Sequence, residues 1–220
     1  MHIRYSAAAC QTDLSNPIER PQMRANTDRM LSMIDSAVAG AAPFLPVRLV
    51  VFPEFAHAAP VFPTVEELLE KLAIPIPNEH TERLAAKARA HGIYIQTGTM
   101  LEADSQWPGA VFNTTCLLGP EGLLYKYRKV NTWIPYEVHA SPHDLKDYEE
   151  PMFPVADTPI GRDRLTLQLV ELTIFAPTLL GPSGGSATNL SWATSTQADR
   201  QDASLCACRR EKHDNSHRSA

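Results

Sequence analysis

Residues 48–55 read Arg-Leu-Val-Val-Phe-Pro-Glu-Phe, and this stretch decides how the rest of the chain is interpreted. The run from Leu49 to Phe52 is apolar at every position, which is typical of a strand covered on both faces of a sheet. Glu54 follows almost at once, and ligands of α/β sheets bind at the carboxyl ends of strands. The stretch therefore predicts a buried strand with a carboxylate in a low-dielectric pocket, where its pKa rises toward that of a useful base. The simpler alternative is that Glu54 only starts a solvated loop.

Helical and extended patterns alternate on both sides of this stretch. Upstream, a run of small apolar residues is followed by an apolar stripe at helical spacing, for which Asn26 and Thr27 are candidate N-caps. Downstream, two helices, one strand and a strand pair around a Gly-Pro-Glu-Gly turn are expected. This order predicts an α/β layered domain. The expected strands are 5–10, 48–53, 93–98, 111–118 and 123–127, and the expected helices are 26–40, 64–72 and 81–91.

Composition restricts the class of protein. The chain has 220 residues, a net charge of −5 and four cysteines. An acidic chain lacks the basic face of a dedicated nucleic-acid binder, and four cysteines are too few for a disulfide scaffold. No apolar run is long enough to span a membrane, and the N-terminus lacks the apolar region of a signal peptide. We therefore expect a cytoplasmic protein with no membrane partner and no nucleic-acid partner.

The pattern changes near residue 162. Residues 1–162 show the alternating elements, whereas residues 183–220 contain only Leu190 and Leu205 as large aliphatic side chains. Such a segment cannot bury enough apolar surface to offset the entropy of ordering it. The prediction is one domain over 1–162 and a divergent, largely disordered tail over 163–220.

A second informative segment, residues 125–137, reads Tyr-Lys-Tyr-Arg-Lys-Val-Asn-Thr-Trp-Ile-Pro-Tyr-Glu. In a strand, alternate side chains share a face, so Lys129 lies on the side of Tyr127, and Lys126 and Arg128 lie on the other. The simpler alternative is a solvated run of basic residues. Stacking of nucleic-acid bases on the aromatic residues is a further alternative, which the acidic net charge disfavours.

A lysine on the aromatic, core-facing side of a strand needs an acidic partner. A lone buried ammonium group is costly because it loses its hydration. Glu54 and Glu137 are the candidate partners of Lys129.

Taken together, these segments resemble the nitrilase (carbon–nitrogen hydrolase) superfamily. The resemblance rests on Val-Phe-Pro-Glu at 51–54, followed 75 residues later by Lys129. Residues 7–13 resemble the family's first strand, and 95–99 and 112–115 resemble its middle strands. Residues 133–137 are most similar to the aliphatic amidase and formamidase branch. The resemblance covers residues 5 to about 162.

The resemblance implies a four-layer αββα sandwich, incomplete in this chain, and a Glu-Lys-Cys mechanism on a small amide or nitrile. Glu54 would be the general base, and Lys129 would stabilise the oxyanion. Glu137 would be the second glutamate, which orients substrate and lysine, while Trp133 and Pro135 would line the substrate pocket. No cofactor and no metal is implied. The family forms dimers and larger assemblies, so a homo-oligomer is an expectation.

The chain departs from the family pattern at the nucleophile. The family's cysteine would fall near Gln168, yet no cysteine lies between Cys116 and Cys206. Cys10 and Cys116 are expected in the core. Cys206 and Cys208 precede two histidines, but their spacing is not that of a zinc site.

Two functional hypotheses follow. One is a carbon–nitrogen hydrolase that has lost its nucleophile from the expected place; neither Ser183 nor Thr166 has positional support as a replacement. The other is a truncated or frame-shifted, catalytically inactive relative, or a non-enzymatic binding protein.

Overall fold

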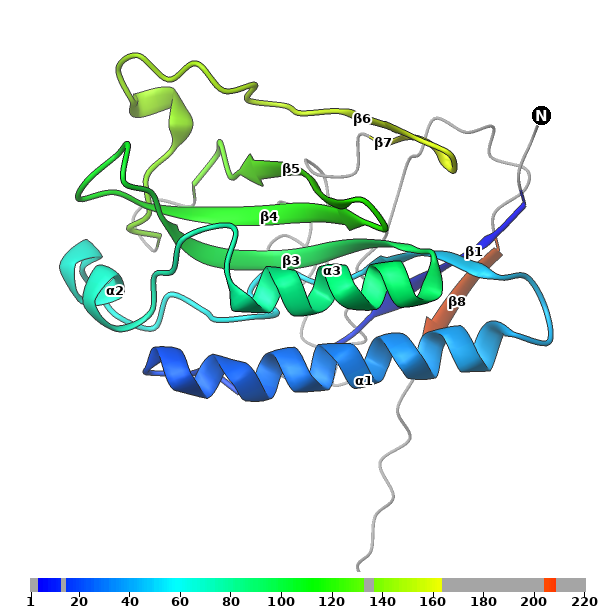
Figure 1. The fold of residues 1–220 in the computed structure, drawn as a ribbon. Coiled ribbons are helices and arrows are strands. Elements are labelled where there is room, and N and C mark those ends of the chain that lie inside the picture. Colours follow the sequence, from blue (N-terminus) through cyan, green and yellow to red (C-terminus); the bar gives the residue numbers. More distant parts are fainter. Residues whose placement is uncertain (1–3, 13–14, 133–136, 164–203, 209–220) are drawn as a thin grey trace, which may run out of the picture.

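The centre of the molecule is a six-stranded sheet (Figure 1), seen in a computed structural model that describes residues 4–12, 15–132, 137–163 and 204–208. The strand order is β5-β4-β3-β2-β1-β8, with β8, β1, β2 and β3 parallel and β4 antiparallel to both of its neighbours. The strands are β1 (Ser6–Cys10), β2 (Val47–Val51), β3 (Tyr94–Ala103), β4 (Val111–Gly119), β5 (Gly122–Arg128) and β8 (Ser204–Cys208). It follows that β5 runs in the same direction as β2.

Helices cover one face of this sheet. They are α1 (Met23–Ala41), α2 (Val65–Lys71) and α3 (Glu79–His91), and α1 and α3 lie side by side beneath the strands in Figure 1. Met30 and Ile34 of α1 and Leu84 of α3 are fully buried in the cluster that includes Val50 and Ile95 of the sheet. Burying these side chains is the main favourable contribution to folding.

A second apolar cluster lies on the other face of the sheet. There Leu49, Tyr94 and Leu117 pack with Ile160, which lies in the turn between β6 (Ala156–Thr158) and β7 (Gly161–Asp163). Because both faces of β2 are buried, the continuous apolar run of this strand is explained. Two short 3₁₀ helices, η1 (Arg20–Gln22) and η2 (Pro142–Asp144), complete the described elements.

The predicted α/β fold is confirmed, and α2 begins after Thr64 as expected, whereas the helix expected over 81–91 begins earlier, at Glu79. Thr64 accepts a hydrogen bond from the backbone N–H of Glu67, and Asn78 forms a capping box with Thr81. Gly92 ends α3 in the left-handed conformation, with φ of 62°. The Thr64 and Asn78 side chains accept from backbone N–H groups that the first helical turn leaves free, and the Gly92 backbone N–H donates to carbonyls of the last turn.

The predicted start of the first helix is wrong. Asn26 and Thr27 do not cap α1, which begins at Met23. Both residues lie within α1, and their buried side chains make tertiary contacts instead of capping the helix. Asn26 donates a hydrogen bond of 2.8 Å to the carbonyl of His57, and Thr27 Oγ1 lies 2.9 Å from His80 Nδ1. These partners lie far away in sequence, so local cap rules do not identify them.

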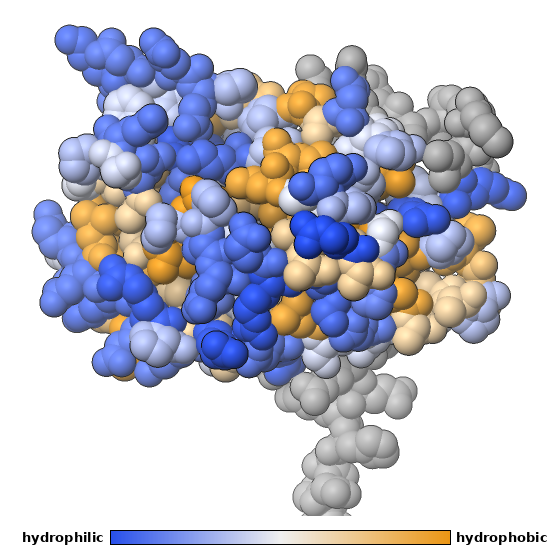
Figure 2. Space-filling model, in the orientation of Figure 1, coloured by the Kyte–Doolittle hydropathy of each residue, from blue (hydrophilic) through white to orange (hydrophobic). Residues whose placement is uncertain are grey.

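The predicted tail lies almost entirely outside the described residues. Only Ser204–Cys208 of the segment 163–220 is described beyond β7, as β8, which pairs in parallel with β1. On the face of the molecule in Figure 2, hydrophilic residues form most of the surface, with apolar residues among them in smaller patches. Within the described part of the chain, no helix has both the length and the apolar character needed to cross a bilayer.

Candidate active site

The sheet topology brings three predicted site residues to one edge. Glu54 lies three residues beyond the end of β2, and Lys129 directly follows β5. Since β2 and β5 run in the same direction, their carboxyl ends lie at the same edge of the sheet, although β3 and β4 separate them. Glu137 lies in the segment that follows Lys129. The positions of Glu54 and Lys129 are thus set by the pairing of the strands that precede them.

Lys129 lies between the two glutamates. Its Nζ is 3.1 Å from Glu54 Oε1 and 2.9 Å from Glu137 Oε1. All three side chains are at least 95% buried, so the contacts are made away from water. The alternatives of a solvated Glu54 loop and a solvated Lys126–Lys129 run are therefore wrong. Glu54 and Glu137, the acidic partners expected for Lys129, are both in contact with its ammonium group.

Asn113 is a fourth residue at this site, and the sequence analysis assigned it no role. Its Nδ2 donates a hydrogen bond of 2.8 Å to Glu54 Oε1, and its backbone carbonyl accepts one of 2.8 Å from the N–H of Lys129. Asn113 is buried on β4. An amide side chain in a strand expected to be buried is a signal that could have identified it, because buried polar groups need partners.

Burial sets the proton affinity of Glu54. Desolvation raises the pKa of its carboxyl from 4.5 to about 7, against the attraction of Lys129, whereas the charge of Glu137 adds to the rise. A carboxyl with a pKa near 7 is poised to accept and return a proton at neutral pH. This is the property that a general base needs.

Close backbone packing fixes the turn that carries Glu54. Phe52 donates a backbone hydrogen bond of 3.0 Å to Gln96, and Phe55, with φ of 57°, donates one of 2.8 Å to Thr99 Oγ1. Gly98 lies beneath this turn with φ of 71°, and a Cβ there would be 2.2 Å from the Pro53 carbonyl oxygen. Only glycine allows β3 to approach the turn so closely.

The segment that carries Glu137 is also anchored to the sheet. Ala140 donates a backbone hydrogen bond of 2.7 Å to Val111, and the Ser141 hydroxyl donates one of 2.5 Å to the carbonyl of Val130. His139 is buried beside Glu137, with Nε2 3.4 Å from Glu137 Oε2. These contacts hold Glu137 close to Lys129.

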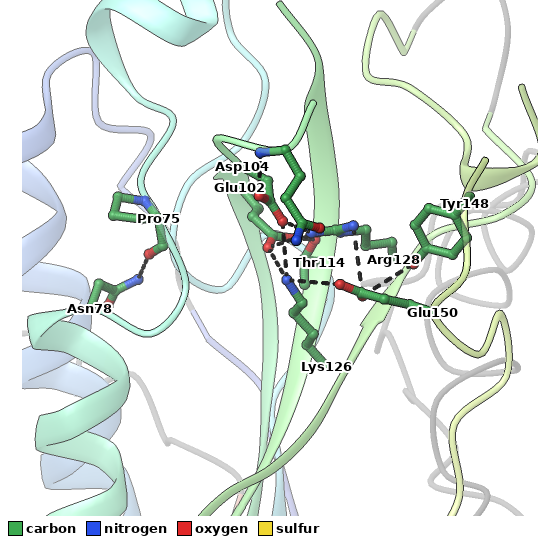
Figure 3. A network of polar contacts seen from close by, with 10 residues as sticks. Pro75, Asn78, Glu102, Asp104, Thr114, Lys126, Arg128, Tyr148 and Glu150 are labelled. Atoms are coloured by element: carbon green, nitrogen blue, oxygen red, sulfur yellow. Dashed lines mark hydrogen bonds and ion pairs between the residues drawn. The ribbon is translucent and has the colours of Figure 1, made fainter. Parts of the chain in front are cut away.

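A second charged cluster lies on the other face of β5 (Figure 3). Arg128 donates two hydrogen bonds, of 2.8 and 2.9 Å, to the carboxylate of Glu102, and Lys126 contacts the same carboxylate at 2.7 Å. Asp104 also bonds Arg128, and Glu150 lies 3.7 Å from it. The predicted alternation of Lys126 and Arg128 against Lys129 is confirmed. The cluster fixes the end of β5 from the side opposite to the site.

Cys10 and Cys116 are not placed for nucleophilic attack. Neither Cys10 nor Cys116 forms a disulfide, and both are fully buried, in agreement with the core position expected for both. Burial raises the pKa of the Cys116 thiol to about 12, so it remains protonated and unreactive. Trp133 and Pro135, predicted to line the substrate pocket, lie outside the described residues. Within the described ranges, no group of three His, Cys, Asp or Glu side chains is placed to hold a metal ion.

Comparison with known proteins assigns the family. A profile described as carbon-nitrogen hydrolase matches residues 6–180, which is most of the chain. The chain belongs to the carbon-nitrogen hydrolase family. The match continues past Arg162, where the motifs recognised in the sequence end.

Curated members of the carbon-nitrogen hydrolase family match the chain over part of their length. An omega-amidase NIT2 of Xenopus tropicalis is 33% identical over 112 residues, which is 50% of this chain and 36% of that protein. A nitrilase of Pyrococcus abyssi is 36% identical over 99 residues, covering 44% of this chain and 36% of that protein. The matched region thus spans about a third of these relatives.

A solved structure of the family shows the same fold. Saccharomyces cerevisiae Nit3, a member of branch 10 of the nitrilase superfamily, aligns with a TM-score of 0.52 and 22% identity. The alignment covers 70% of this chain and 52% of Nit3. The nitrilase-like α/β fold is confirmed, and this chain accounts for about half of it.

The raised pKa of Glu54 predicts how stability depends on pH. The folded chain holds this proton more tightly than the unfolded chain, so wild-type stability falls as pH rises from about 4.5 through about 7. Glu54→Gln cannot ionise. Relative to wild type, we therefore expect this variant to be about 2 kcal/mol more stable at pH 8 than at pH 5, measured as the free energy of unfolding.

Urea unfolding at the two pH values measures this difference, and Glu102→Gln is the control. Burial alone would raise the pKa of Glu102, but hydrogen bonds from Arg128 and Lys126 hold it below its usual value. Glu102 is therefore ionised in both the folded and the unfolded chain from pH 5 to 8. The difference in the free energy of unfolding between Glu102→Gln and wild type should be the same at both pH values. A constant gap for Glu54→Gln as well would contradict the raised pKa.

Proposed function

We propose that this chain is a hydrolase of non-peptide carbon–nitrogen bonds in a small amide or nitrile, working through Glu54, Lys129 and Glu137. The observation that supports this most is the buried arrangement in which Lys129 Nζ contacts one oxygen of each glutamate. A base and a cation held in a dry site are what attack on a carbonyl carbon requires. Family membership and the curated names, omega-amidase and nitrilase, support the same reaction class.

Each residue has a distinct role in the proposed reaction with an amide. In the Glu-Lys-Cys mechanism that the family resemblance implies, the nucleophile is a thiol whose surroundings the structure does not describe; Glu54 takes its proton as the carbon–sulfur bond to the carbonyl carbon forms. Lys129 stabilises the negative charge that develops on the carbonyl oxygen, and Glu137 orients Lys129. Glu54 then returns the proton to the nitrogen, the carbon–nitrogen bond breaks and ammonia leaves. Water then attacks the acyl carbon, the carbon–sulfur bond breaks, the thiol regains a proton and the acyl group leaves as a carboxylate.

A second candidate is a relative that binds small amides without turning them over. The observation that favours it is that the only thiols whose surroundings the structure describes, Cys10 and Cys116, are buried in the core. In a thiol mechanism, loss of the nucleophile lowers the rate by several orders of magnitude. Binding requires only the polar groups that remain.

Ammonia release from formamide, acetamide and propionamide by the purified full-length chain tests the proposal. We expect turnover that falls at least about 100-fold in Glu54→Gln, because the general base is lost. Glu67→Gln is the matched control, since Glu67 lies on the surface in a pair with Lys71 and should leave the rate unchanged. Cys116→Val should also leave it unchanged.

Binding measured by thermal shift separates the two candidates. Ammonia release that depends on Glu54 supports the hydrolase. A saturable shift with an amide, lost in Lys129→Met and without ammonia, supports the binding protein and overturns the hydrolase. Neither ammonia nor a shift would overturn both.

A further inference from the structure

We propose that Asn113 is a positioning residue that makes Oε2 of Glu54 the oxygen that exchanges the proton. This inference rests on the proposed function and deepens it, because it names the atom at which the base works. The four groups that carry it are the Asn113 amide, both oxygens of Glu54 and the Lys129 ammonium.

Both donors to Glu54 converge on the same oxygen. Asn113 Nδ2 lies 2.8 Å and Lys129 Nζ 3.1 Å from Oε1. Within the described part of the chain, the side-chain hydrogen bonds that Glu54 accepts are both at Oε1 and not at Oε2. Hydrogen bonds to one carboxylate oxygen stabilise negative charge on it, so the proton binds at the other oxygen. Oε2 is therefore the atom that takes a proton from a nucleophile.

The backbone holds Asn113 in place on both sides. In the sheet Asn113 is the partner of Leu101 on β3, and its carbonyl accepts the N–H of Lys129. The same residue thus positions the start of the Lys129 segment by its backbone and the base by its side chain. Moving Asn113 would move the base relative to the cation.

The buried carbonyl of the Asn113 side chain argues against a purely structural role. Asn113 Oδ1 is buried and accepts no hydrogen bond within the described residues. Leaving a buried acceptor unpaired is unfavourable, and an apolar residue of the same size would avoid it. An amide at this position is explained if its N–H group is needed at Glu54.

The titration of Glu54, followed by carbon-13 NMR of glutamate side-chain carboxyls, tests the proposal without requiring turnover. Glu54→Gln identifies the resonance. In Asn113→Leu we expect the midpoint of Glu54 to rise by about one pH unit, because the ionised carboxylate loses a donor. The matched control is Thr115→Val. Thr115 lies two positions after Asn113 on β4 and is equally buried, and the substitution removes the hydrogen bond that it accepts from Gln96. It should leave the midpoint unchanged.

A second variant keeps the test decisive if Asn113→Leu does not fold. Asn113→Asp has the same shape but places a second acid beside Oε1, so one proton is shared and the midpoint of Glu54 should rise further. If the titration midpoint of Glu54 is unchanged in whichever of the two Asn113 variants folds, the proposal is overturned. An equal shift in Thr115→Val would also overturn it.

The titration tests the role of Asn113, and the ammonia assay tests the proposed function, so either hypothesis can be rejected without the other. If no amide is hydrolysed, the proposed function fails, while the midpoints still report whether Asn113 acts on Glu54. If turnover is found, kcat/KM should rise with pH through the midpoint of Glu54, and this acidic limb should shift upward in Asn113→Leu by the same amount. A limb that stays in place while the rate falls would assign Asn113 a merely structural role.

Discussion

Lys129→Met is expected to lower the free energy of unfolding by about 3–5 kcal/mol at pH 8. The substitution leaves two buried carboxylates, Glu54 and Glu137, facing each other without the cation between them. Removing one member of a buried ion cluster is costly because the remaining charges stay desolvated. At pH 5 the loss should be smaller, since Glu54 binds a proton there. Urea unfolding at both pH values measures it.

The same substitution at the surface is the control for Lys129. Lys87 contacts Asp35 at 2.8 Å, but both side chains are partly exposed, so Lys87→Met should cost less than about 1 kcal/mol. Equal losses for the two variants would contradict a buried role for Lys129. A triple variant that also carries Glu54→Gln and Glu137→Gln should regain most of the stability, because no buried charge is left unpaired.

Arg128→Met is expected to have the second-largest effect, a loss of about 3 kcal/mol at pH 7. Glu102 is buried and loses its bidentate partner, while Lys126 and the hydroxyl of Thr114 still donate to it. The pKa of Glu102 is lowered in the folded chain because hydrogen bonds offset its burial. Its ion pair therefore stabilises the fold above pH 4.5, and the gap between variant and wild type should narrow below that value.

Lys126→Met is the matched control for Arg128. Lys126 also contacts Glu102, but its side chain reaches solvent, so the expected loss is about 1 kcal/mol or less. If Lys126→Met and Arg128→Met lower the free energy of unfolding equally, the bidentate pair of Arg128 with Glu102 would contribute no more than the single contact of Lys126. Urea unfolding at pH 4 and 7 provides both comparisons.

Much of the sheet could be predicted from the sequence, because its elements are short and strongly patterned. The apolar run before Glu54 and the Gly119–Gly122 turn fixed β2 and the β4–β5 hairpin in advance. The alternation of Lys126, Arg128 and Lys129 also separated the two charged clusters correctly. In each case the deciding signal lies within a few residues of the element that it describes.

What the sequence did not reveal depends on contacts between distant segments. Asn26 and Thr27 look like caps but bond His57 and His80, which lie 31 and 53 residues away. The role of Asn113 depends on Glu54, 59 residues earlier, and on a pairing that no local pattern encodes. Likewise β3 extends to Ala103, since Glu102 is neutralised by cations from β5.

The two charged clusters flank β5 on opposite faces, and this arrangement has a consequence for folding. A slip of one residue between β4 and β5 would turn each cation away from the acids that now hold it. Glu54 and Lys129 are also 75 residues apart, and in the native sheet their contact depends on three strand pairings, β2 with β3, β3 with β4 and β4 with β5. The buried ion pairs thus favour one register of the β4–β5 hairpin, because a shifted register would leave buried charges without their partners.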